Sequence, residues 1–312
     1  MIHGFIVIDK PAGITSHDVV SRVRRIAGTR RVGHTGTLDP FATGVLPIAV
    51  NDGTKTIPFL DEGLKCYEAL MQLGLSTDTL DITGQALSEG DYSLVTEDLL
   101  RGAFTRFTGT ISQTPPMYSA IKQNGQPLYK LARQGQQVER AARQVEIHSL
   151  ELLSFSPPYV SLRVTCSRGT YVRTLADDIG ALLGCGACLK ELRRTASGPF
   201  HLRNSLTLEM LEDVFREGCP ADRFITPYEA LGHLPDLSLK QAGLTKVLHG
   251  RSPEWSEVEL GQQSRSNLNS GLVRLSLGAE LVAVAEIRGG AEQLPKITLK
   301  RVFRTEPDNR CP

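Results

Sequence analysis

The stretch from residue 33 to residue 44 reads Gly33-His34-Thr35-Gly36-Thr37-Leu38-Asp39-Pro40-Phe41-Ala42-Thr43-Gly44. Three glycines, threonines beside glycine and an Asp-Pro step favour neither a helix nor a strand, so we predict a loop with a constrained backbone. A phosphate-binding loop does not fit, because no lysine follows the glycines as in a P-loop and no G-x-G-x-x-G is present. His34 and Asp39 are the candidate functional side chains of this loop.

The chain before this loop predicts a strand and then a helix. Residues 5–8 are apolar and precede Pro11 and Gly13, which is typical of a short buried strand that ends in a turn. Either Thr15 or Ser16 can cap the helix that follows. The apolar residues that share one face of this helix are Val19, Val20, Val23 and Ile26.

A second strand and helix are predicted farther along the chain. Residues 160–167 alternate between apolar and polar side chains, which indicates a half-buried strand. After Arg168-Gly169, apolar residues recur at helical spacing from Val172 to Leu183. Arg173 therefore stands where a strand gives way to a helix, a place from which side chains can project into a cleft.

The length of 312 residues suggests two domains. Prolines punctuate the chain after residue 219, and we place the boundary near residue 234. Beyond it, short apolar runs at residues 272–275, 281–287 and 297–303 predict a small β-rich domain, with turn signals at Asn269-Ser270-Gly271 and Gly289-Gly290. The first domain lacks a regular βαβ alternation, so an α+β fold is predicted.

The charges are unevenly distributed along the chain. Five arginines and no acid lie between residues 22 and 31, and five basic residues between residues 122 and 143 face only Glu139. Residues 61–98 hold nine acids and one lysine. A basic face for a polyanion and an acidic back would explain this pattern, although most charge runs are merely solvated surfaces.

The six cysteines and the N-terminus indicate a reduced, cytoplasmic protein. The apolar run at residues 5–8 is too short for a signal peptide or a membrane helix. Cys185 and Cys188 form a C-x-x-C without the second pair that a zinc site usually needs, so we interpret them as packing residues. Neither a metal site nor a disulfide framework is predicted.

The stretch around Asp39 resembles the active-site motif of the TruB family of pseudouridine synthases. Phe41 stands where the family more often has leucine. Further segments match the family in the same order: V-I-D-K-P-A-G-I-T-S at residues 7–16, K-C-Y-E-A at 65–69, C-S-R-G-T-Y-V-R-T-L at 166–175 and L-R-R at 192–194. The resemblance spans roughly residues 3–230, with a weaker match in the C-terminal domain.

This resemblance implies the roles of three catalytic residues. Asp39 would be the nucleophile, Arg173 would pair with it, and Tyr67 would lie beside the target base. Forming pseudouridine only exchanges a bond from N1 for a bond from C5, so neither a cofactor nor a metal is implied. An arginine beside an aspartate typically lowers the carboxyl pKa by about 1–3, so we expect a depressed pKa at Asp39.

The same resemblance implies a set of substrate contacts. The target base must be flipped out of a folded RNA loop and stacked on an aromatic ring, for which Tyr67 is the candidate. His34 would fill or prop the vacated place in the RNA loop. Tyr171 and Leu192 would contact the flipped nucleotide. On the residues alone, Tyr67 and Leu192 would be interpreted as core residues.

The implied architecture is a pseudouridine synthase domain at residues 1–233, with a mixed, mainly antiparallel sheet and flanking helices. A thumb-like insertion at about residues 113–144 would grip the RNA, and residues 234–312 would form a PUA-like RNA-binding domain. The basic residues expected near the acceptor stem are Lys296, Lys300, Arg301 and Arg304. The implied substrate is uridine 55 in the tRNA T-arm loop, modified without guide RNA or protein partner. A monomer is expected, because the sequence has no obvious apolar interface stripe.

Two other functions remain open from the sequence. The basic segments would also suit a tRNA-folding chaperone in which catalysis is secondary. Asp177 and Asp178 suggest a glycosidase, but neighbours on a helix diverge by about 100° and cannot flank one bond. We therefore interpret both as helix-surface residues. Arg173 could also pair with Asp177, which lies one turn along the same predicted helix.

Overall fold

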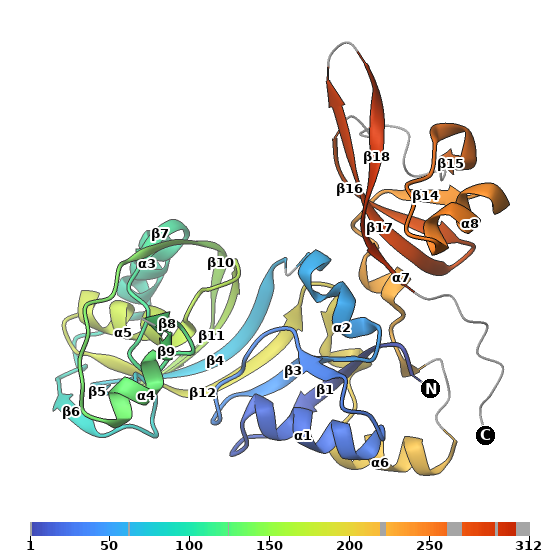
Figure 1. The fold of residues 1–312 in the computed structure, drawn as a ribbon. Helices are drawn as coiled ribbons and strands as arrows, with labels where there is room; N and C mark the ends of the chain where they lie inside the picture. The colour runs from blue at the N-terminus through green and yellow to red at the C-terminus, as the bar shows by residue number, and fades with distance from the viewer. Residues whose placement is uncertain are drawn as a thin grey trace.

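The computed structural model contains two large β-sheets, which lie in different parts of the molecule, and two small two-stranded sheets (Figure 1). It describes residues 2–61, 63–123, 125–218, 223–260, 270–290 and 293–303. Predictions that concern Cys219, Pro220, Asn269, Arg304 and Cys311 therefore lie outside the described residues.

The first sheet has nine strands and forms the centre of the larger domain. Its spatial order is β1 (Gly4–Lys10), β3 (Thr43–Val50), β12 (Ala187–Ser197), β4 (Lys65–Leu73), β11 (Tyr159–Cys166), β10 (Arg143–Ser156) and β7 (Gly109–Gln113), with β2 (Val32–His34) on β3 and β13 (Phe200–His201) on β12. Among the described strands of this sheet, only β3 and β12 pair in parallel. The predicted α+β fold with a mixed, mainly antiparallel sheet is confirmed.

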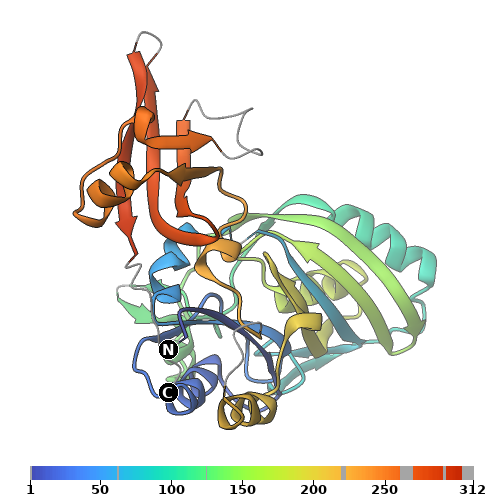
Figure 2. The same ribbon diagram turned by 90° about the vertical axis from the view of Figure 1, so that its right-hand side faces the viewer.

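Four helices contribute to the main hydrophobic core on one face of this sheet (Figures 1 and 2). They are α1 (Ser16–Ile26), α3 (Glu97–Phe107), α5 (Val172–Leu182) and α6 (Leu208–Arg216). Both faces of strand β1 are buried. Ile6 and Ile8 pack into this core, whereas Phe5 and Val7 pack into a second hydrophobic cluster. A strand with both faces covered reads as the continuous apolar run seen at residues 5–8.

The predicted helix starts and junctions agree with the structure. Thr15 is the cap of α1, and it forms a capping box with Asp18, so the helix begins at Ser16. Strand β11 ends at Cys166 and helix α5 begins at Val172, which confirms the predicted strand-to-helix junction.

The prediction of a loop from residue 33 to residue 44 was too long. Gly33 and His34 belong to β2, and β3 already begins at Thr43, so the loop covers residues 35–42. Long-range pairing overrides the weak strand propensity of these residues. Gly33 pairs with Ala49 in the ladder between β2 and β3.

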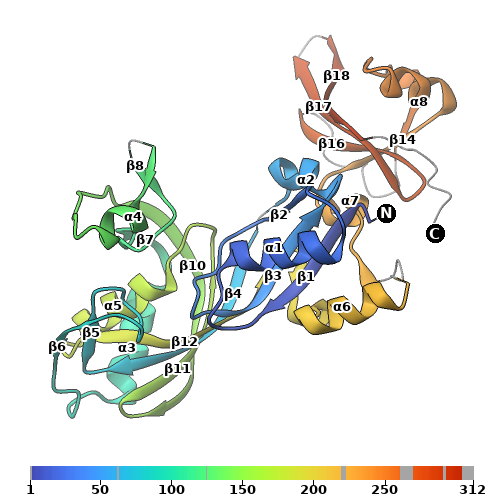
Figure 3. The same cartoon turned by 60° about the horizontal axis from the view of Figure 1, so that its bottom comes forward.

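Several short elements complete the larger domain. They are α2 (Gly53–Thr56), η1 (Ile57–Phe59), β5 (Leu75–Thr77), β6 (Ala86–Glu89), β8 (Lys122–Gln123), β9 (Gln126–Pro127), α4 (Leu128–Arg133), η2 (Leu202–Asn204) and α7 (Pro227–Ala230). Strands β8 and β9 and helix α4 lie between β7 and β10 in the sequence. They occupy the end of the large sheet that is far from the C-terminal sheet (Figures 1 and 3).

The second sheet confirms the predicted β-rich C-terminal part. Its order is β15 (Val258–Leu260), β14 (Asp236–Leu239), β16 (Ser270–Leu277), β17 (Glu280–Gly290) and β18 (Gln293–Val302). Helix α8 (Gln241–Leu248) and η4 (Trp255–Glu257) accompany it. The predicted turn residues Ser270 and Gly271 instead begin β16, because they pair with the end of β17.

The two parts of the chain share a small apolar cluster. Leu231, which follows α7, packs with Leu281, Val284 and Phe303 of the C-terminal part. Among the described residues, no helix combines the length and the apolar character needed to cross a membrane.

Candidate active site

The loop at residues 35–42 is tied to the start of helix α1. The Ser16 hydroxyl donates to the Leu38 carbonyl at 3.0 Å and accepts from the Leu38 amide at 2.9 Å. The amide of Gly13 donates to the carbonyl of Pro40 at 2.8 Å. These bonds fix the backbone on both sides of Asp39, so the N-terminal turn and the loop form one unit.

A buried lysine strengthens this connection. The Lys10 ammonium donates to the carbonyls of Pro11 and Ile14 at 2.8 Å each and to the carbonyl of Pro40 at 3.2 Å. Burial lowers the pKa of Lys10 to about 8, an effect that the charge of Asp39 opposes. The three carbonyls use all three of its donors. Lys10 therefore links the turn that contains Pro11 and Ile14 to the loop that contains Pro40.

A buried arginine supports the loop from β12. Arg194 donates to the carbonyls of Val45 at 2.7 Å, Gly36 at 3.1 Å and Thr37 at 3.4 Å. Gly44 has a φ of +100°, and a Cβ there would lie 2.2 Å from the Arg194 carbonyl. Only glycine allows β3 to approach β12 this closely.

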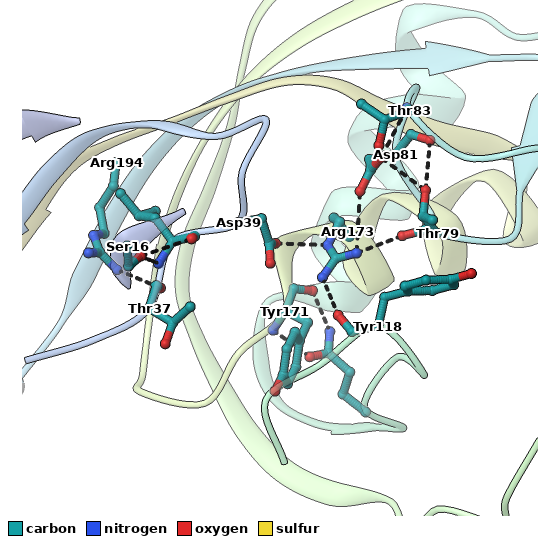
Figure 4. A network of polar contacts seen from close by, with 12 residues as sticks. Ser16, Thr37, Asp39, Thr79, Asp81, Thr83, Tyr118, Tyr171, Arg173 and Arg194 are labelled. Carbon is teal, nitrogen blue, oxygen red and sulfur yellow. Dashed lines mark hydrogen bonds and ion pairs between the residues drawn. The ribbon is translucent and has the colours of Figure 1, made fainter. Parts of the chain in front are cut away.

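The centre of the site is an ion pair between the loop and helix α5 (Figure 4). Arg173 Nε lies 2.9 Å from Asp39 Oδ2, and Nη1 lies 3.3 Å from Asp81 Oδ2. The guanidinium also donates to the carbonyls of Thr79 and Tyr118 at 2.8 Å each. Arg173 is 3% exposed, whereas 31% of the Asp39 side chain remains accessible. The Asp39 carboxylate is therefore oriented by buried Arg173 on one side and remains accessible on the other.

Arg173 does not make the alternative pair with Asp177 that the helix spacing allowed. Its side chain turns toward two carboxylates from other segments, Asp39 and Asp81. Both lie far from α5 in the sequence, so the spacing within the helix could not reveal them.

Asp81 was not among the residues predicted from the sequence. It lies within residues 61–98, the acidic stretch interpreted as a neutralising back, but its carboxylate is buried next to Arg173. Asp81 Oδ1 accepts from the hydroxyls of Thr79 and Thr83 and from the amide of Thr83. A local signal existed, because an aspartate between two threonines and before Gly84 is typical of a side chain that organises a turn.

The expected depression of the Asp39 pKa is wrong in direction. Burial of the carboxyl raises its pKa, and the negative charge of Asp81 adds to this effect. Arg173 and Lys10 lower the pKa but do not outweigh burial. Because Arg173 also pairs with Asp81 in this desolvated site, it lowers the pKa of Asp39 less than an arginine that faces Asp39 alone.

Tyr67 lies at the floor of the same region, on β4. Its ring is 7% exposed, and it stands opposite Arg194 of β12 and Val164 of β11. Burial raises the pKa of its hydroxyl, while Arg194 lowers it and Asp39 raises it. The hydroxyl is therefore protonated at neutral pH and lies within the electrostatic reach of Asp39.

His34 lies at the end of β2, next to the loop. Its ring is half-buried, and Nδ1 is buried with no hydrogen-bond partner among the described residues. Burial lowers the His34 pKa below its ordinary value, and the charges of Arg194 and His17 lower it further. The ring is therefore neutral near pH 7.

The other two predicted substrate contacts lie on neighbouring elements. Tyr171 is the residue that precedes α5, and burial raises the pKa of its half-buried hydroxyl, with the charge of Asp39 as a further cause. Leu192 is buried in β12 opposite Ala69, one pair along this face of the sheet from Arg194 and Tyr67. Of the six predicted residues, Asp39 lies in the loop and His34 directly precedes it. Arg173 pairs with Asp39, and Tyr67 and Tyr171 lie within its electrostatic reach. Leu192 lies on the adjoining strand β12.

The rival residues lie elsewhere. Asp177 and Asp178 are half-buried rather than surface residues, and burial raises the pKa of Asp178 to about 6. Cys185 and Cys188 are buried free thiols. Among the residues that the structure describes, no group of three or more His, Cys, Asp or Glu side chains could hold a metal ion.

Comparison with known proteins identifies the family. Residues 24–172 match the N-terminal domain of the TruB family pseudouridylate synthases, and residues 173–231 match the C-terminal domain of tRNA pseudouridylate synthase B. A protein of Geotalea uraniireducens named tRNA pseudouridine synthase B is 51% identical, over 97% of this chain and 98% of that protein. The protein of that name from Pseudomonas aeruginosa is 49% identical, over 81% and 85%.

Solved structures agree with the fold. The crystal structure of a Cbf5-Nop10-Gar1 complex superposes with a TM-score of 0.73 and 31% identity, over 96% of this chain and 84% of that chain. The archaeal box H/ACA sRNP Nop10-Cbf5 complex gives a TM-score of 0.72 and 28% identity, over 97% and 86%. On the identity to its curated relatives, together with these matches, the chain belongs to the TruB family of pseudouridine synthases.

Proposed function

We propose that this protein converts uridine 55 in the T-arm loop of tRNA to pseudouridine, with Asp39 as the nucleophile. The single observation that carries the proposal is the Asp39 carboxylate, held from behind by buried Arg173 and accessible in front. The name of the Geotalea relative, tRNA pseudouridine synthase B, supports tRNA as the substrate.

The reaction is an isomerisation. The bond from uracil N1 to ribose C1′ breaks, the base turns, and a bond forms from C5 to C1′. The proton leaves C5, and N1 gains one. Asp39 holds the intermediate covalently while the base turns. Because its pKa is raised, the carboxylate is a stronger nucleophile than an ordinary aspartate once it is ionised.

Tyr67 receives the flipped base. Extruding a stacked nucleotide costs a few kcal/mol, and stacking on an aromatic ring returns about 1–3 kcal/mol. The Tyr67 hydroxyl also shuttles the C5 proton: it takes the proton from C5 as it gives its own proton to N1. His34 occupies the place that the base leaves, and Tyr171 and Leu192 contact the flipped nucleotide.

The rest of the chain grips the RNA. We assign residues 1–233 to the catalytic domain and residues 234–312 to a PUA-like RNA-binding domain, with the insertion at about 113–144 against the T-arm. Lys122 and Lys130 of the insertion are cations suited to phosphates. Such an insertion favours an enzyme that acts without guide RNA or protein partner. We propose that it acts as a monomer in the cytoplasm.

The proposal is tested with unmodified tRNA transcript that carries tritium at uridine C5. We expect tritium release without added cofactor, and a single primer-extension stop in the T-arm loop after carbodiimide treatment. Asp39→Asn should bind the tRNA but release no tritium. Turnover by this variant would exclude the nucleophilic role of Asp39.

The same experiment distinguishes the rival functions. Tight tRNA binding without tritium release would favour the folding chaperone. Release of free uracil would favour a glycosidase. RNA affinity should fall steeply with salt, because neutralising phosphates releases counterions. Affinity that does not change between low and moderate salt would exclude the basic segments as the RNA face.

A further inference from the structure

Gln113 makes a two-point contact with the residue that precedes helix α5. Its side-chain carbonyl accepts from the Tyr171 amide at 2.8 Å, and its side-chain amide donates to the Tyr171 carbonyl at 3.1 Å. Gln113 is 2% exposed, so its side-chain amide is buried beside half-buried Tyr171. A buried amide that satisfies both backbone groups of one residue fixes that residue as a neighbouring strand would.

The contact falls where helix α5 begins. Tyr171 has an extended backbone and no side-chain cap, and its carbonyl also accepts from the amide of Leu175 within the helix. Fixing the peptide groups of Tyr171 therefore sets the direction of the first helical turn. Arg173, which aims Asp39, lies in that turn.

Gln113 also stands at the point where the insertion leaves the sheet. It is the last residue of β7 and pairs with Arg143 of β10, so residues 114–142 form the excursion between these strands. The insertion returns to the same place, because the Tyr118 carbonyl accepts from the Arg173 guanidinium at 2.8 Å. The insertion thus positions Arg173 in two ways. It does so directly through the Tyr118 carbonyl, and indirectly through the contact of Gln113 with Tyr171.

We propose that Gln113 is a positioning residue for the isomerisation: its side-chain amide holds Tyr171 so that Tyr171 and the Arg173 guanidinium keep their places beside Asp39. The inference rests on the function proposed above, because it takes Arg173 and Tyr171 as parts of the active site. It adds a residue from the root of the RNA-gripping insertion to the frame of that site.

The test uses Gln113→Glu, which keeps the shape of the side chain. As a carboxylate, Glu can accept from the Tyr171 amide but cannot donate to its carbonyl. As a carboxylic acid, it can do both. We expect the single-turnover rate at saturating enzyme to be at least about tenfold below wild type at pH 8. The ratio of variant to wild-type rate should rise as the pH falls toward 5.

Taking the ratio at each pH removes the titration of Asp39, which both proteins share. The charged and titratable groups that act on Tyr171 are Arg143 on β10, Arg173 on α5 and Asp39 in the loop. Gln113→Met has no titratable group, so its rate ratio should stay low at every pH. Gln72→Glu is the matched control, because it adds the same charge to a half-exposed position on β4.

A second measurement does not depend on activity. The Arg173 Nε–H resonance, assigned by its loss in Arg173→Lys, should move in Gln113→Glu at pH 8 and return toward its wild-type position as the pH falls. An inactive wild-type enzyme would count against the proposed function and leave this measurement to decide on Gln113. A rate ratio near one at pH 8, or a ratio and a resonance that do not respond to pH, would overturn the inference.

Discussion

Two buried arginines, Arg173 and Arg274, show how the same side chain serves two different purposes. Arg274 lies where the C-terminal sheet joins the rest of the chain. It donates to the Tyr228 carbonyl at 2.8 Å, lies 3.3 Å from Asp236 Oδ1 and stacks 4.0 Å from the centre of the Tyr228 ring. Arg173 likewise combines backbone carbonyls with carboxylates.

The partners of the two arginines differ in accessibility. The Asp236 side chain is 17% exposed and also accepts from the Ser276 hydroxyl, so the Arg274 cluster is complete without a ligand. The Asp39 side chain is nearly twice as exposed as that of Asp236, and the pKa of Asp39 is raised. A buried ion pair by itself is therefore no sign of a catalytic site. The sign is a carboxylate that is desolvated, held and still reachable.

The largest expected effect is on the rate, at Arg173. In Arg173→Lys the charge remains, but an ammonium cannot reach two carboxylates and two carbonyls in one plane. We expect the single-turnover rate to fall by about 10²–10³, with tRNA affinity little changed. Quench-flow tritium release measures the rate, and filter binding measures the affinity. A Lys variant with wild-type rate would remove Arg173 from the mechanism.

A smaller effect is expected at the second carboxylate. Asp81→Asn removes a negative charge that raises the Asp39 pKa, so that pKa should fall. The acid limb of the pH–rate profile should then move to lower pH, while the rate at neutral pH drops about tenfold because Arg173 loses an anchor. An acid limb that stays in place would show that Asp81 does not act on Asp39 electrostatically.

The matched change at Arg274 should affect stability alone. Arg274→Met removes one member of the partly buried Arg274–Asp236 ion pair, which should cost about 3 kcal/mol in the free energy of unfolding. The single-turnover rate at 25 °C should equal that of wild type. Urea denaturation measures the first quantity. A loss of rate comparable to that of Arg173→Lys would contradict the division between the two arginines.

The smallest effect is a pH-dependent gain in stability at Asp39. A carboxyl with a raised pKa binds its proton more tightly in the folded state, so its stabilising contribution is full below the unfolded pKa and is lost as the pH rises through the folded pKa. Asp39→Asn does not titrate. Its free energy of unfolding relative to wild type should therefore increase as the pH rises from about 4. A difference independent of pH would mean that the Asp39 pKa is not raised.

The sequence was informative where the pattern is local. The glycines and the Asp-Pro step located the loop that carries Asp39, and the alternation at residues 160–167 located the strand before Arg173. The apolar runs after residue 270 located three strands of the second sheet. Each of these signals is contained within about a dozen residues.

The sequence was uninformative where the partners are distant. Asp81 and Arg173 lie 92 residues apart, and Gln113 and Tyr171 lie 58 residues apart. Counting acids over residues 61–98 also averaged over buried and exposed positions, which hid the carboxylate of Asp81 that faces Arg173. The pKa of Asp39 was misjudged for a related reason, since desolvation and the charge of Asp81 depend on the folded surroundings.

The hydrogen bonds by which Arg194 supports the loop have a consequence for how the protein is synthesised. Arg194 and Val45, which it bonds, are separated by 149 residues. At about 5–20 residues per second, the ribosome completes the loop roughly 7–30 s before it adds this arginine. A nascent chain therefore carries every atom of the Asp39 loop for many seconds without the support that shapes it. The enzyme cannot act on RNA near the ribosome until β12 has been synthesised.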